Sequence, residues 1–501
     1  MSLGKRFHAL GLHMHQPPGN LKLLLEQHPW EAEQIIQCYA RPPRYAKKYQ
    51  DIATFHVGFS GTLLEQLLDP EIQAGYADII DIPAMLQSWR EAENIELLGM
   101  GYFHPLMPLI PQQDWAEQVV RGRQMIRQTF GRAPEGFWPA EMAFSMAMIP
   151  TLVEAGYRYV VVDGVHLRPE QGSDEGQTDI YTPYLATYEG QSITVVPRDR
   201  NLSNAQESGL DTSWLANEVI QQTGTPTAES PPQLITTWSD GENGGWFRQM
   251  DETAGFWGHF FSPCMEHCRS GEFPMQPTSL SQFLSLHPAK ATTQVETGAW
   301  NVADTSGMDF SQWAGSDGQK QGVSRLHTLA YRYDLLKKGK ARRTKADKAA
   351  MTRAYETLLK AETSCYLFWG DAWLPQLHTL LDDVTEQLSF LEAHRAEQPT
   401  TTKRRATESS RAKAAPKRSS SQPSSDQPLT TPAPRTVAKR EPTAAKGQKT
   451  TSKPKTEAGQ RSASPAKSAA TTPPPSRRQK QPAATASPDG SSQRGSRKKK
   501  G

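Results

Sequence analysis

The stretch GFWPAEMAFS, residues 136–145, sets one carboxylate, Glu141, among aromatic and other apolar side chains. Burying a carboxylate is unfavourable unless it is protonated, ion-paired or hydrogen-bonded, so an acid in these surroundings needs a chemical reason. The stretch begins like a short strand and leads into the helical pattern of MIPTLVEAG. It therefore predicts a strand-to-helix unit whose loop carries a functional acid.

Six further strand-like runs lie before and after this unit, and helical patterns separate them. They are RFHALGLHMH (6–15), ATFHVGF (53–59), IELLGMGYFHP (95–105), YRYVVVDG (157–164), ITVVPRD (193–199) and QLITTWSDGE (233–242). Strands that alternate with helices predict a parallel α/β barrel or a doubly wound sheet. A dinucleotide-binding doubly wound fold has a Gly-rich turn after an early strand. The sequence has no such turn, which favours the barrel.

Side chains capable of chemistry stand at the carboxyl ends of the predicted strands: His13, His15, His104, Glu141, Asp163, Arg198 and Asp240. Active sites of parallel barrels are built at that end of the strands. Asp163 can either face a substrate or cap the turn after its strand.

Asp240 is a second acid in aromatic surroundings, in TTWSDGENGGWF (236–247), between Trp238 and Trp246. Glycoside cleavage uses two carboxyl groups, one as nucleophile or base and one as an acid with a raised pKa. Aromatic rings offer apolar faces to sugars. Glu141 and Asp240 are therefore a candidate catalytic pair, and two unrelated structural acids are the alternative.

His13 and His15, in HMHQPP (13–18), lie two residues apart on a strand and so face the same side. Such a pair can bind a metal or hydrogen-bond a substrate hydroxyl, and Gln16 with the two prolines predicts a loop leaving the strand. CMEHC (264–268) could be half of a second metal site, but no further cluster of ligands lies near it in the sequence.

Beyond residue 320 the pattern becomes helical, which predicts a helical region, 316–395, after a catalytic barrel, 1–315. A tail, 396–501, follows. It contains no aromatic residue, and residues 398–501 carry 24 Lys and Arg against 5 Asp and Glu. This composition cannot offset the entropy cost of ordering, so we expect disorder. Its positive charge suits nonspecific attraction to nucleic acid or another polyanion, or a solvated extension without a dedicated partner.

The four cysteines are few for 501 residues, as is usual in a reducing compartment. The first residues contain no apolar segment of the signal-peptide kind, and no apolar run approaches the length of a membrane span. We therefore expect a cytoplasmic protein without membrane contact.

Five motifs, in order, resemble the conserved regions of glycoside hydrolase family 57: HMHQPP, GMGYFHPLMPLI, GFWPAEMAFS, TTWSDGENGGWF and ETGAW. The resemblance extends over residues 6–395. It implies an incomplete (β/α)7 barrel followed by a helical region, and retaining cleavage or transfer of α-glucosidic bonds. Starch, glycogen and maltooligosaccharides would be the substrates, and no cofactor or metal is implied.

The same resemblance implies roles for individual residues. Glu141 would be the nucleophile and Asp240 the general acid/base. The implied substrate contacts are His13, His15, Gln16, His104, Trp138, Arg198, Trp246, Trp300, Trp369 and Asp371. Ionised Glu141 would need hydrogen bonds or a cationic neighbour such as Arg198 or a histidine.

The chain departs from the family pattern in two places. Many members have Ser-Asp-Trp at the start of the late helix, where this chain has TSCYLFWG with Cys365 and Tyr366; the acidic contact is then missing or moved to Asp371. His104 in GYFHP matches a branch described loosely as amylase- or mannosidase-like. Trp369 can be a sugar platform or a core residue.

Three classes of function follow. The first is a retaining α-glycoside hydrolase or α-glucanotransferase. The second is a metal-dependent α-mannosidase- or deacetylase-like hydrolase, in which His13, His15 and an acid bind Zn²⁺. The third is a catalytically silent glucan-binding protein with a polyanion-binding tail. The intact pair of Glu141 and Asp240 favours the first.

Overall fold

The computed structural model describes residues 6–168, 179–209, 211–224, 230–300, 310–339 and 343–397. All of these residues belong to one compact unit, which spans Met1–Arg405. The tail that the sequence predicts to be disordered, 396–501, lies outside the described residues apart from its first two positions. No helix in the described part of the chain is long and apolar enough to cross a membrane.

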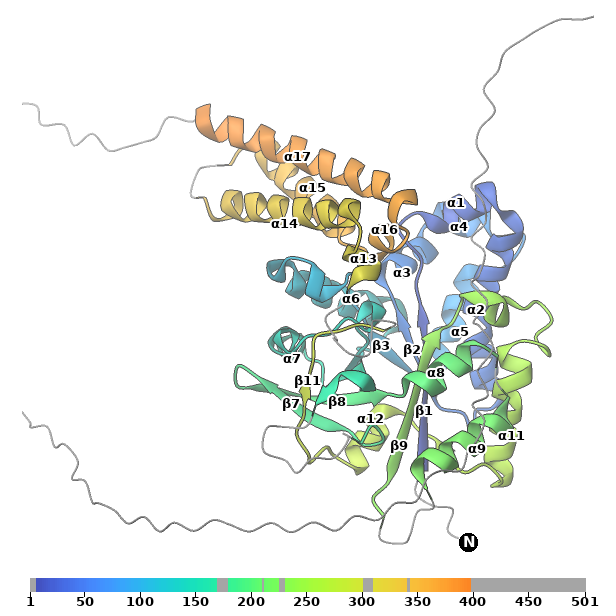
Figure 1. Cartoon of the computed structure of the whole chain (residues 1–501). Helices are drawn as coiled ribbons and strands as arrows, with labels where there is room; N and C mark the ends of the chain where they lie inside the picture. The colour runs from blue at the N-terminus through green and yellow to red at the C-terminus, as the bar shows by residue number, and fades with distance from the viewer. Residues whose placement is uncertain are drawn as a thin grey trace, which may run out of the picture. The chain divides into compact units, whose positions relative to one another are not determined.

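Parallel strands form the centre of this unit (Figure 1): β1 (Arg6–Met14), β2 (Phe55–Phe59), β3 (Ile95–Gly99), β4 (Gly136–Phe137), β5 (Tyr159–Asp163), β8 (Gln191–Arg198) and β9 (Gln233–Asp240). Their order in the sheet is β9, β1, β2, β3, β4, β5, β8. The two ends of this row, β8 and β9, meet where the N–H of Asp199 donates to the carbonyl of Thr236 (2.9 Å). Each run that the sequence predicts as a strand overlaps one of these strands, which confirms an α/β fold with a mostly parallel sheet.

Shorter strands extend the sheet or pair beside it: β6 (Leu167–Arg168), β7 (Tyr184–Tyr188), β10 (Gln276–Pro277) and β11 (Gln294–Val295). β7 is antiparallel to β8, β10 is parallel to the start of β1, and β6 pairs with β11.

Helices surround the strands: α1 (Asn20–Gln27), α2 (Pro29–Lys48), α3 (Gly61–Leu68), α4 (Pro70–Gly75), α5 (Ile82–Glu91), α6 (Trp115–Phe130), α7 (Ile149–Glu154), α8 (Arg200–Glu207), α9 (Thr212–Thr223), α10 (Gly244–Arg248), α11 (Ser262–Ser270) and α12 (Leu280–Leu286). The late helices are α13 (Ser311–Ala314), α14 (Asp317–Lys338), α15 (Lys345–Ala361), α16 (Ser364–Phe368) and α17 (Leu374–Glu397). The short turns are η1 (Met107–Leu109), η2 (Gln112–Asp114), η3 (Ala140–Met142), η4 (Met146–Met148), η5 (Gly164–His166), the π-helical η6 (Phe256–Phe261) and η7 (Gly370–Ala372).

Side-chain caps directly after strands keep the strand-to-helix turns short. Ser60 follows the last residue of β2, and its hydroxyl accepts the N–H of Leu63 in α3 (3.2 Å). Asp199 follows the last residue of β8, and its carboxylate accepts the N–H of Leu202 in α8 (2.9 Å). Such caps satisfy backbone donors that a helix start leaves free. The helices therefore begin close to the carboxyl ends of the strands, where the predicted site lies.

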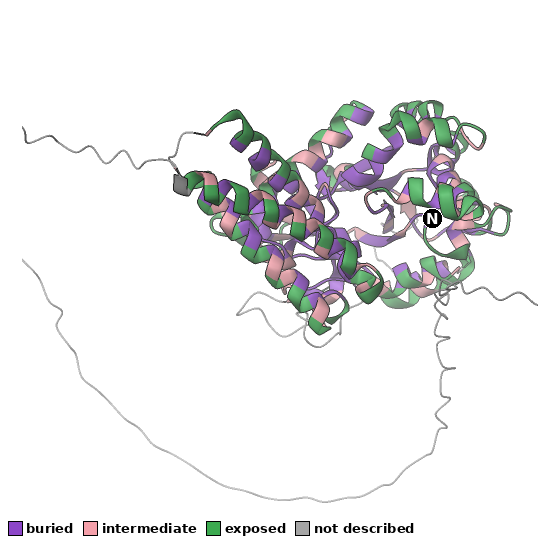
Figure 2. Ribbon diagram, turned by 90° about the horizontal axis from the view of Figure 1, so that it is seen from above, coloured by how far each residue is buried: buried purple, intermediate pink, exposed green. Residues whose placement is uncertain are grey.

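Figure 2 shows from above that the strands are mostly buried and that the exposed residues lie on the helices and loops around them. The apolar core divides into two clusters. One contains Leu10, Leu12 and Met14 of β1 together with α2 and η6. The other joins the interior of the sheet, including Trp138 and Trp238, to the late helices.

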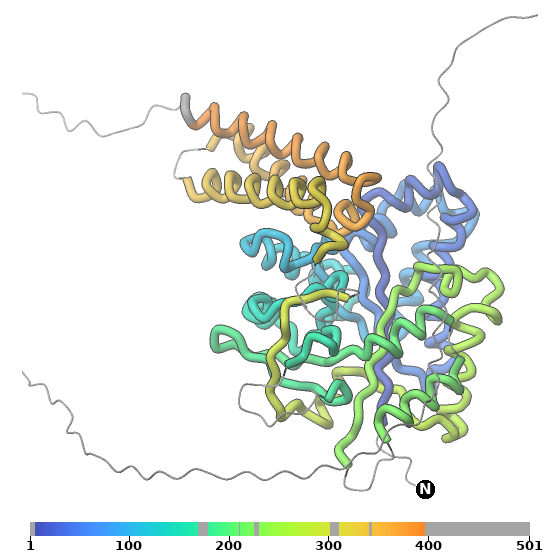
Figure 3. Tube along the Cα trace, viewed as in Figure 1, coloured from blue at the N-terminus to red at the C-terminus, as the bar shows by residue number. Residues whose placement is uncertain are grey.

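The late helices pack together, and the start of α16 contacts the loop after β3 at the carboxyl end of the sheet. Helices α14, α15 and α17 pack on one another, and their path can be followed in Figure 3. Thr363 forms an isolated β-bridge with Pro105, and the N–H of Ser364 donates to the carbonyl of His104 (3.0 Å). This junction brings the start of α16 to the loop that follows β3.

All four cysteines are free and buried. Cys264 and Cys268 of α11 lie in the apolar cluster that contains α2 and η6, whereas His267 is exposed. Within the described residues, these three side chains do not form a group of converging ligand atoms, so the half metal site suggested by CMEHC has no geometric support.

Candidate active site

Glu141 lies beyond the carboxyl end of β4, in the turn η3. Its φ is 56°, that of the next residue, Met142, is 51°, and that of His104, in the loop after β3, is 57°. A left-handed φ costs a non-glycine residue about 1–3 kcal/mol and persists only where surrounding contacts hold it. Backbone strain is therefore concentrated at the end of the sheet where the sequence predicts chemistry.

Both carboxylate oxygens of Glu141 accept hydrogen bonds from distant segments. The indole N–H of Trp300 donates to Oε2 (2.7 Å), and the hydroxyl of Ser364 donates to Oε1 (2.9 Å). The backbone N–H of Trp300 also donates to the carbonyl of Glu141 (2.9 Å). An indole N–H can only donate, so these contacts fix the carboxyl group and favour its ionised form.

Burial opposes that charge. It raises the pKa of Glu141 to about 7, and the nearby charge of Asp240 adds to the rise. Burial also raises the pKa of Asp240, against a hydrogen bond from Asn243 (2.9 Å to Oδ2) and the positive charge of Arg198. Burial, and then the charge of Asp240, also raises the pKa of Glu207 to about 7. The charge of ionised Asp240 disfavours ionisation of Glu141, so the site favours states that keep a proton, as an acid catalyst requires.

The register of β1 and β9 brings Asp240 to this end of the sheet. Asp240 is the last residue of β9 and pairs with His13 on β1. The N–H of Gly241 donates to the carbonyl of His13 (2.8 Å), so the two strand ends are joined beyond the last pair. Asp240 as a residue is partly exposed.

Three histidines stack beside Glu141. The rings of His15 and His104 are parallel, with centroids 3.8 Å apart, and Nε2 of His104 lies 3.0 Å from Nε2 of His13. Nδ1 of His104 hydrogen-bonds the Ser364 hydroxyl (2.8 Å), and Nδ1 of His15 hydrogen-bonds the Ser60 hydroxyl (2.8 Å). Burial lowers the pKa of His13 to about 3 and holds the pKa values of the other two well below their usual range. All three imidazoles are therefore neutral at pH 7.

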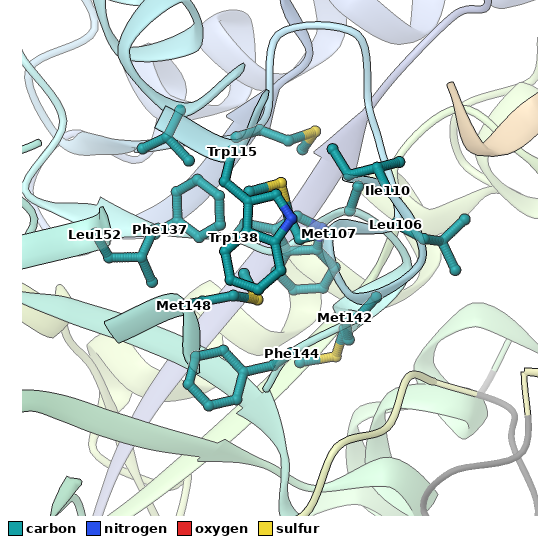
Figure 4. Close-up of a cluster of buried hydrophobic side chains, with 14 of the residues drawn as sticks. Leu106, Met107, Ile110, Trp115, Phe137, Trp138, Met142, Phe144, Met148 and Leu152 are labelled. Atoms are coloured by element: carbon teal, nitrogen blue, oxygen red, sulfur yellow. The ribbon is translucent and has the colours of Figure 1, made fainter. Parts of the chain in front are cut away.

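Two tryptophans form the floor beneath the histidines. Trp138 and Trp238 stack with ring centroids 4.9 Å apart, and His13 stacks above Trp138 at 5.9 Å. A Cβ atom at Gly11 would lie 2.0 Å from the Trp238 ring, so β1 admits this indole only because it carries glycine there. Figure 4 shows Trp138 among its apolar neighbours. Its side chain is 0% exposed, so the predicted substrate contact lies under the site.

Arg198 is held from several sides at the end of β8. Its Nη1 lies 3.3 Å from Oδ2 of Asp163, and its guanidinium carbon lies 5.9 Å from the centroid of the Trp300 ring. Asp163 also pairs with Arg200 (2.9 Å) and accepts the N–H of Val165 (3.3 Å). Of the two roles that the sequence allows for Asp163, capping and ion pairing are the ones its contacts fit.

The contacts recorded for Gln16 and Trp246 are with residues other than the two acids. Gln16 is buried and accepts a hydrogen bond from Asn20 (2.6 Å). Trp246 packs edge-on against His259, with centroids 5.6 Å apart, beside the apolar cluster that contains α2 and η6. Trp369, 54% exposed, and Asp371 lie in the turn after α16.

The comparison with known families decides among the folds that share such an arrangement. The model of glycosyl hydrolase family 57 matches residues 9–291, more than half of the chain. The chain belongs to this family.

Its relatives include enzymes named for α-glucan chemistry. Alpha-amylase 1 of Dictyoglomus thermophilum is 29% identical over 192 residues, 38% of this chain and 25% of the relative. The 4-alpha-glucanotransferase of Thermococcus litoralis is 27% identical over 235 residues, 47% of this chain and 32% of the relative. The chain thus spans a quarter to a third of these two proteins. A solved family 57 branching enzyme from Thermococcus kodakaraensis shares the fold, with a TM-score of 0.60 and 15% identity over 78% of this chain and 94% of that chain.

The sequence did not predict two residues of this family 57 site, Glu242 and Ser364. Glu242 is buried, and its Oε1 accepts the backbone N–H of His15 (2.5 Å); burial, and then the charge of Asp240, raises its pKa well above the usual range. The run Asp-Gly-Glu at 240–242 was the available signal. Ser364 had none, because it reaches Glu141 from 223 residues away.

Proposed function

We propose that the chain is a retaining α-glycoside hydrolase or α-glucanotransferase that acts on α-glucans such as starch, glycogen and maltooligosaccharides. The observation that carries this proposal is the carboxyl group of Glu141, which is hydrogen-bonded at both oxygens and has a pKa that burial and the charge of Asp240 raise. The relatives named alpha-amylase and 4-alpha-glucanotransferase support the same substrate class.

In the proposed reaction, an oxygen of Glu141 attacks the anomeric carbon while Asp240 donates its proton to the leaving glycosidic oxygen. The C–O bond breaks and a covalent glycosyl ester forms on Glu141. Asp240, now ionised, then takes a proton from water in hydrolysis, or from an acceptor sugar hydroxyl in transfer, as that oxygen displaces Glu141. Two inversions at one carbon retain the configuration.

The neighbouring side chains support a sugar site at this position. Neutral His13, His15 and His104 can exchange hydrogen bonds with hydroxyls without adding charge beside the acids. Trp300 holds Glu141, and Arg198 lies against its ring. We place these five around the cleaved sugar. We place Gln16, Trp246, Trp369 and Asp371 in outer parts of the substrate site, above the floor that Trp138 forms.

The strand order supports an incomplete (β/α)7 barrel over residues 1–315. The first and last strands of the parallel row, β9 and β8, lie beside each other and are joined by the hydrogen bond from the N–H of Asp199 to the carbonyl of Thr236. Residues 316–395 are proposed as the helical region, which contributes Ser364 to the site.

For the tail, 396–501, we propose nonspecific binding to nucleic acid or another polyanion, on the basis of its positive charge. The full chain and a chain ending at Glu397 should be compared for binding to DNA, RNA and heparin between about 50 and 200 mM salt. Only the full chain should bind, and binding should weaken steeply with salt. Equal binding by the shortened chain rejects this role.

Product analysis tests the enzymatic proposal. The full chain, dialysed against EDTA, should release or transfer α-linked glucose units from a panel of α-glucans, and NMR of the first products should show the α-anomer. Initial β-anomers would exclude retention. Activity that disappears with EDTA and returns with Zn²⁺ would favour the metal-dependent hydrolase instead.

A further inference from the structure

Three side chains from distant segments place potential metal ligands together beside Glu141. His15 follows β1, His104 lies in the loop after β3, and Cys365 belongs to α16. One ligand atom from each lies within 4.8 Å of the others, and no second group of three or more such ligands converges in the described part of the chain. None of the roles proposed above uses the thiol of Cys365.

The contacts inside this cluster already pair an imidazole with the thiol. Nε2 of His15 lies 3.1 Å from Sγ of Cys365, and the His15 and His104 rings lie parallel at 3.8 Å. Cys365 and His104 are buried, whereas His15 is partly exposed. An ion could therefore approach from the side of His15.

Hydroxyl groups hold both imidazoles in place. Ser60 bonds Nδ1 of His15, and Ser364 bonds Nδ1 of His104, each at 2.8 Å. Hydrogen bonds of this kind at the second ring nitrogen orient histidine ligands in metal sites. The Nε2 lone pair of His15 is thereby directed toward the thiol when Nδ1 carries the proton.

We propose that His15, His104 and Cys365 bind a thiophilic divalent metal ion of the zinc class, and that the bound ion inhibits the enzyme. The inhibitory part rests on the proposed glucan-processing function. Two imidazoles and one thiolate are a ligand set typical of Zn²⁺, with the fourth position left to water. Tetrahedral bonds bring such donor atoms to about 3.3–3.6 Å from one another, so the parallel rings of His15 and His104 must tilt until both ring nitrogens point at the ion.

Binding exchanges a proton for the metal. The S–H bond of Cys365 breaks, its proton leaves to solvent, and the thiolate sulfur bonds the ion, as metal binding to cysteine requires. His104 must at the same time exchange one of its two contacts, with Ser364 or with His13, for a bond to the metal.

Inhibition follows from the distance to the nucleophile. Ser364 bridges the two groups, with Oγ 2.8 Å from Nδ1 of His104 and 2.9 Å from Oε1 of Glu141. Nδ1 of His104 lies 3.9 Å from the same oxygen. A divalent charge here attracts the carboxylate of Glu141, and the ion occupies the wall on which a sugar would contact His15 and His104.

Cobalt substitution tests the site without requiring activity. The reduced, metal-free full chain should bind one equivalent of Co²⁺, with a thiolate-to-cobalt charge-transfer band that EDTA or excess Zn²⁺ removes. Cys365→Ser should abolish the band, and His15→Gln should weaken cobalt binding at least tenfold. Cys268→Ser, at another buried cysteine, is the matched control and should keep the band. A wild-type chain without the band, or a band that Cys365→Ser leaves and Cys268→Ser removes, overturns the site.

Enzyme assays test the inhibition. Zn²⁺ should inhibit the wild type reversibly, and Cys365→Ser should need at least tenfold more Zn²⁺ for half-inhibition, each protein being compared with its own metal-free rate. Equal sensitivity of the two proteins overturns the inhibitory role. A metal-free protein that turns over no glucan instead refutes the proposed function, while the cobalt band still reports on the site. If Cys365→Ser does not fold, the wild-type cobalt spectrum and the cobalt affinity of His15→Gln decide whether the metal site exists.

Discussion

Two largely buried carboxyl groups, Glu96 and Glu141, lie at opposite ends of the parallel strands, and their surroundings shift their pKa values in opposite directions. Glu96, on β3, accepts the hydroxyl of Tyr159 (2.5 Å) and the N–H (3.1 Å) and hydroxyl (3.0 Å) of Ser281. Burial alone would raise its pKa, but His56, Tyr159 and Ser281 lower it to about 2. Glu141 has two donors and a second acid nearby, and its pKa rises to about 7.

We infer from this difference that Glu96 stabilises the fold, whereas Glu141 serves the proposed reaction. The surplus of donors at Glu96 makes its charge a stabilising part of the fold, beside a cavity of about 390 Å³ that Glu96 lines with Asn94 and Arg132. At Glu141 the same charge is poorly compensated, and the backbone is strained, with φ of 56°. Poorly compensated charge is a common property of catalytic groups. Substitutions at the two positions should therefore have opposite consequences.

The largest expected effect is on turnover. Glu141→Gln should lower kcat on an α-glucan by about 10⁴-fold or more, because it removes the nucleophile of the proposed reaction. Glu96→Gln should change kcat per folded molecule by less than about tenfold, since Glu96 touches no proposed site residue. Glu135→Gln, the same substitution just before β4, serves as the surface control. Comparable kcat values for Glu141→Gln and Glu135→Gln would remove Glu141 from the mechanism.

The next effect is a loss of stability at the other carboxylate. Glu96→Gln should lower the free energy of unfolding by about 3 kcal/mol at pH 7, because a lowered pKa stabilises the fold above the pKa of the unfolded state. The loss should shrink as the pH falls toward 2, where folded Glu96 takes up its proton. Urea unfolding at several pH values measures it. A loss that is the same at pH 7 and at pH 3 would show that Glu96 does not act through its charge.

The stability effect at Glu141 should have the opposite sign. A raised pKa means that the fold keeps a proton which the unfolded chain releases, so stability falls as the pH rises from about 4.5 to 7. Glu141→Gln should therefore raise the free energy of unfolding by about 1–3 kcal/mol at pH 8 and by less at pH 5. The same urea series measures this gain. A destabilised variant at pH 8 would contradict the assignment of an uncompensated charge.

The smallest effect concerns the coupling between the two acids. Asp240→Asn removes a negative charge that helps to raise the pKa of Glu141. We use an aryl α-glucoside whose leaving group needs no protonation, so that the acidic limb of the pH profile of kcat/KM reports the ionisation of Glu141. This limb should move to lower pH by about one unit or less. Glu135→Gln should leave the limb in place. A limb that does not move for Asp240→Asn would show that the two carboxyl groups titrate independently.

Much of the fold and part of the site were predictable from local patterns. The strands could be predicted because apolar residues alternate within each of them and a helix-capping residue follows a few positions later. Ser60 and Asp199 are two such caps. The predicted run 95–105 ends as a strand at Gly99, and the chain beyond it reaches His104 with its left-handed φ. That turn depends on contacts with Ser364, which the local sequence does not contain.

By itself, the sequence determined that Glu141 and Asp240 stand at strand ends, and in a parallel sheet all such ends meet at one edge. It also carried the motifs of family 57, which the family match confirms. Only the tertiary structure decided that hydrogen-bond donors stabilise the charge of Glu96 more than that of Glu141, because the pKa of a carboxyl group depends on the donors that face it. Those donors come from far along the chain: Ser281 lies 185 residues from Glu96, and Trp300 lies 159 residues from Glu141. Cys365 reaches His15 across 350 residues in the same way, so no local pattern could reveal their meeting.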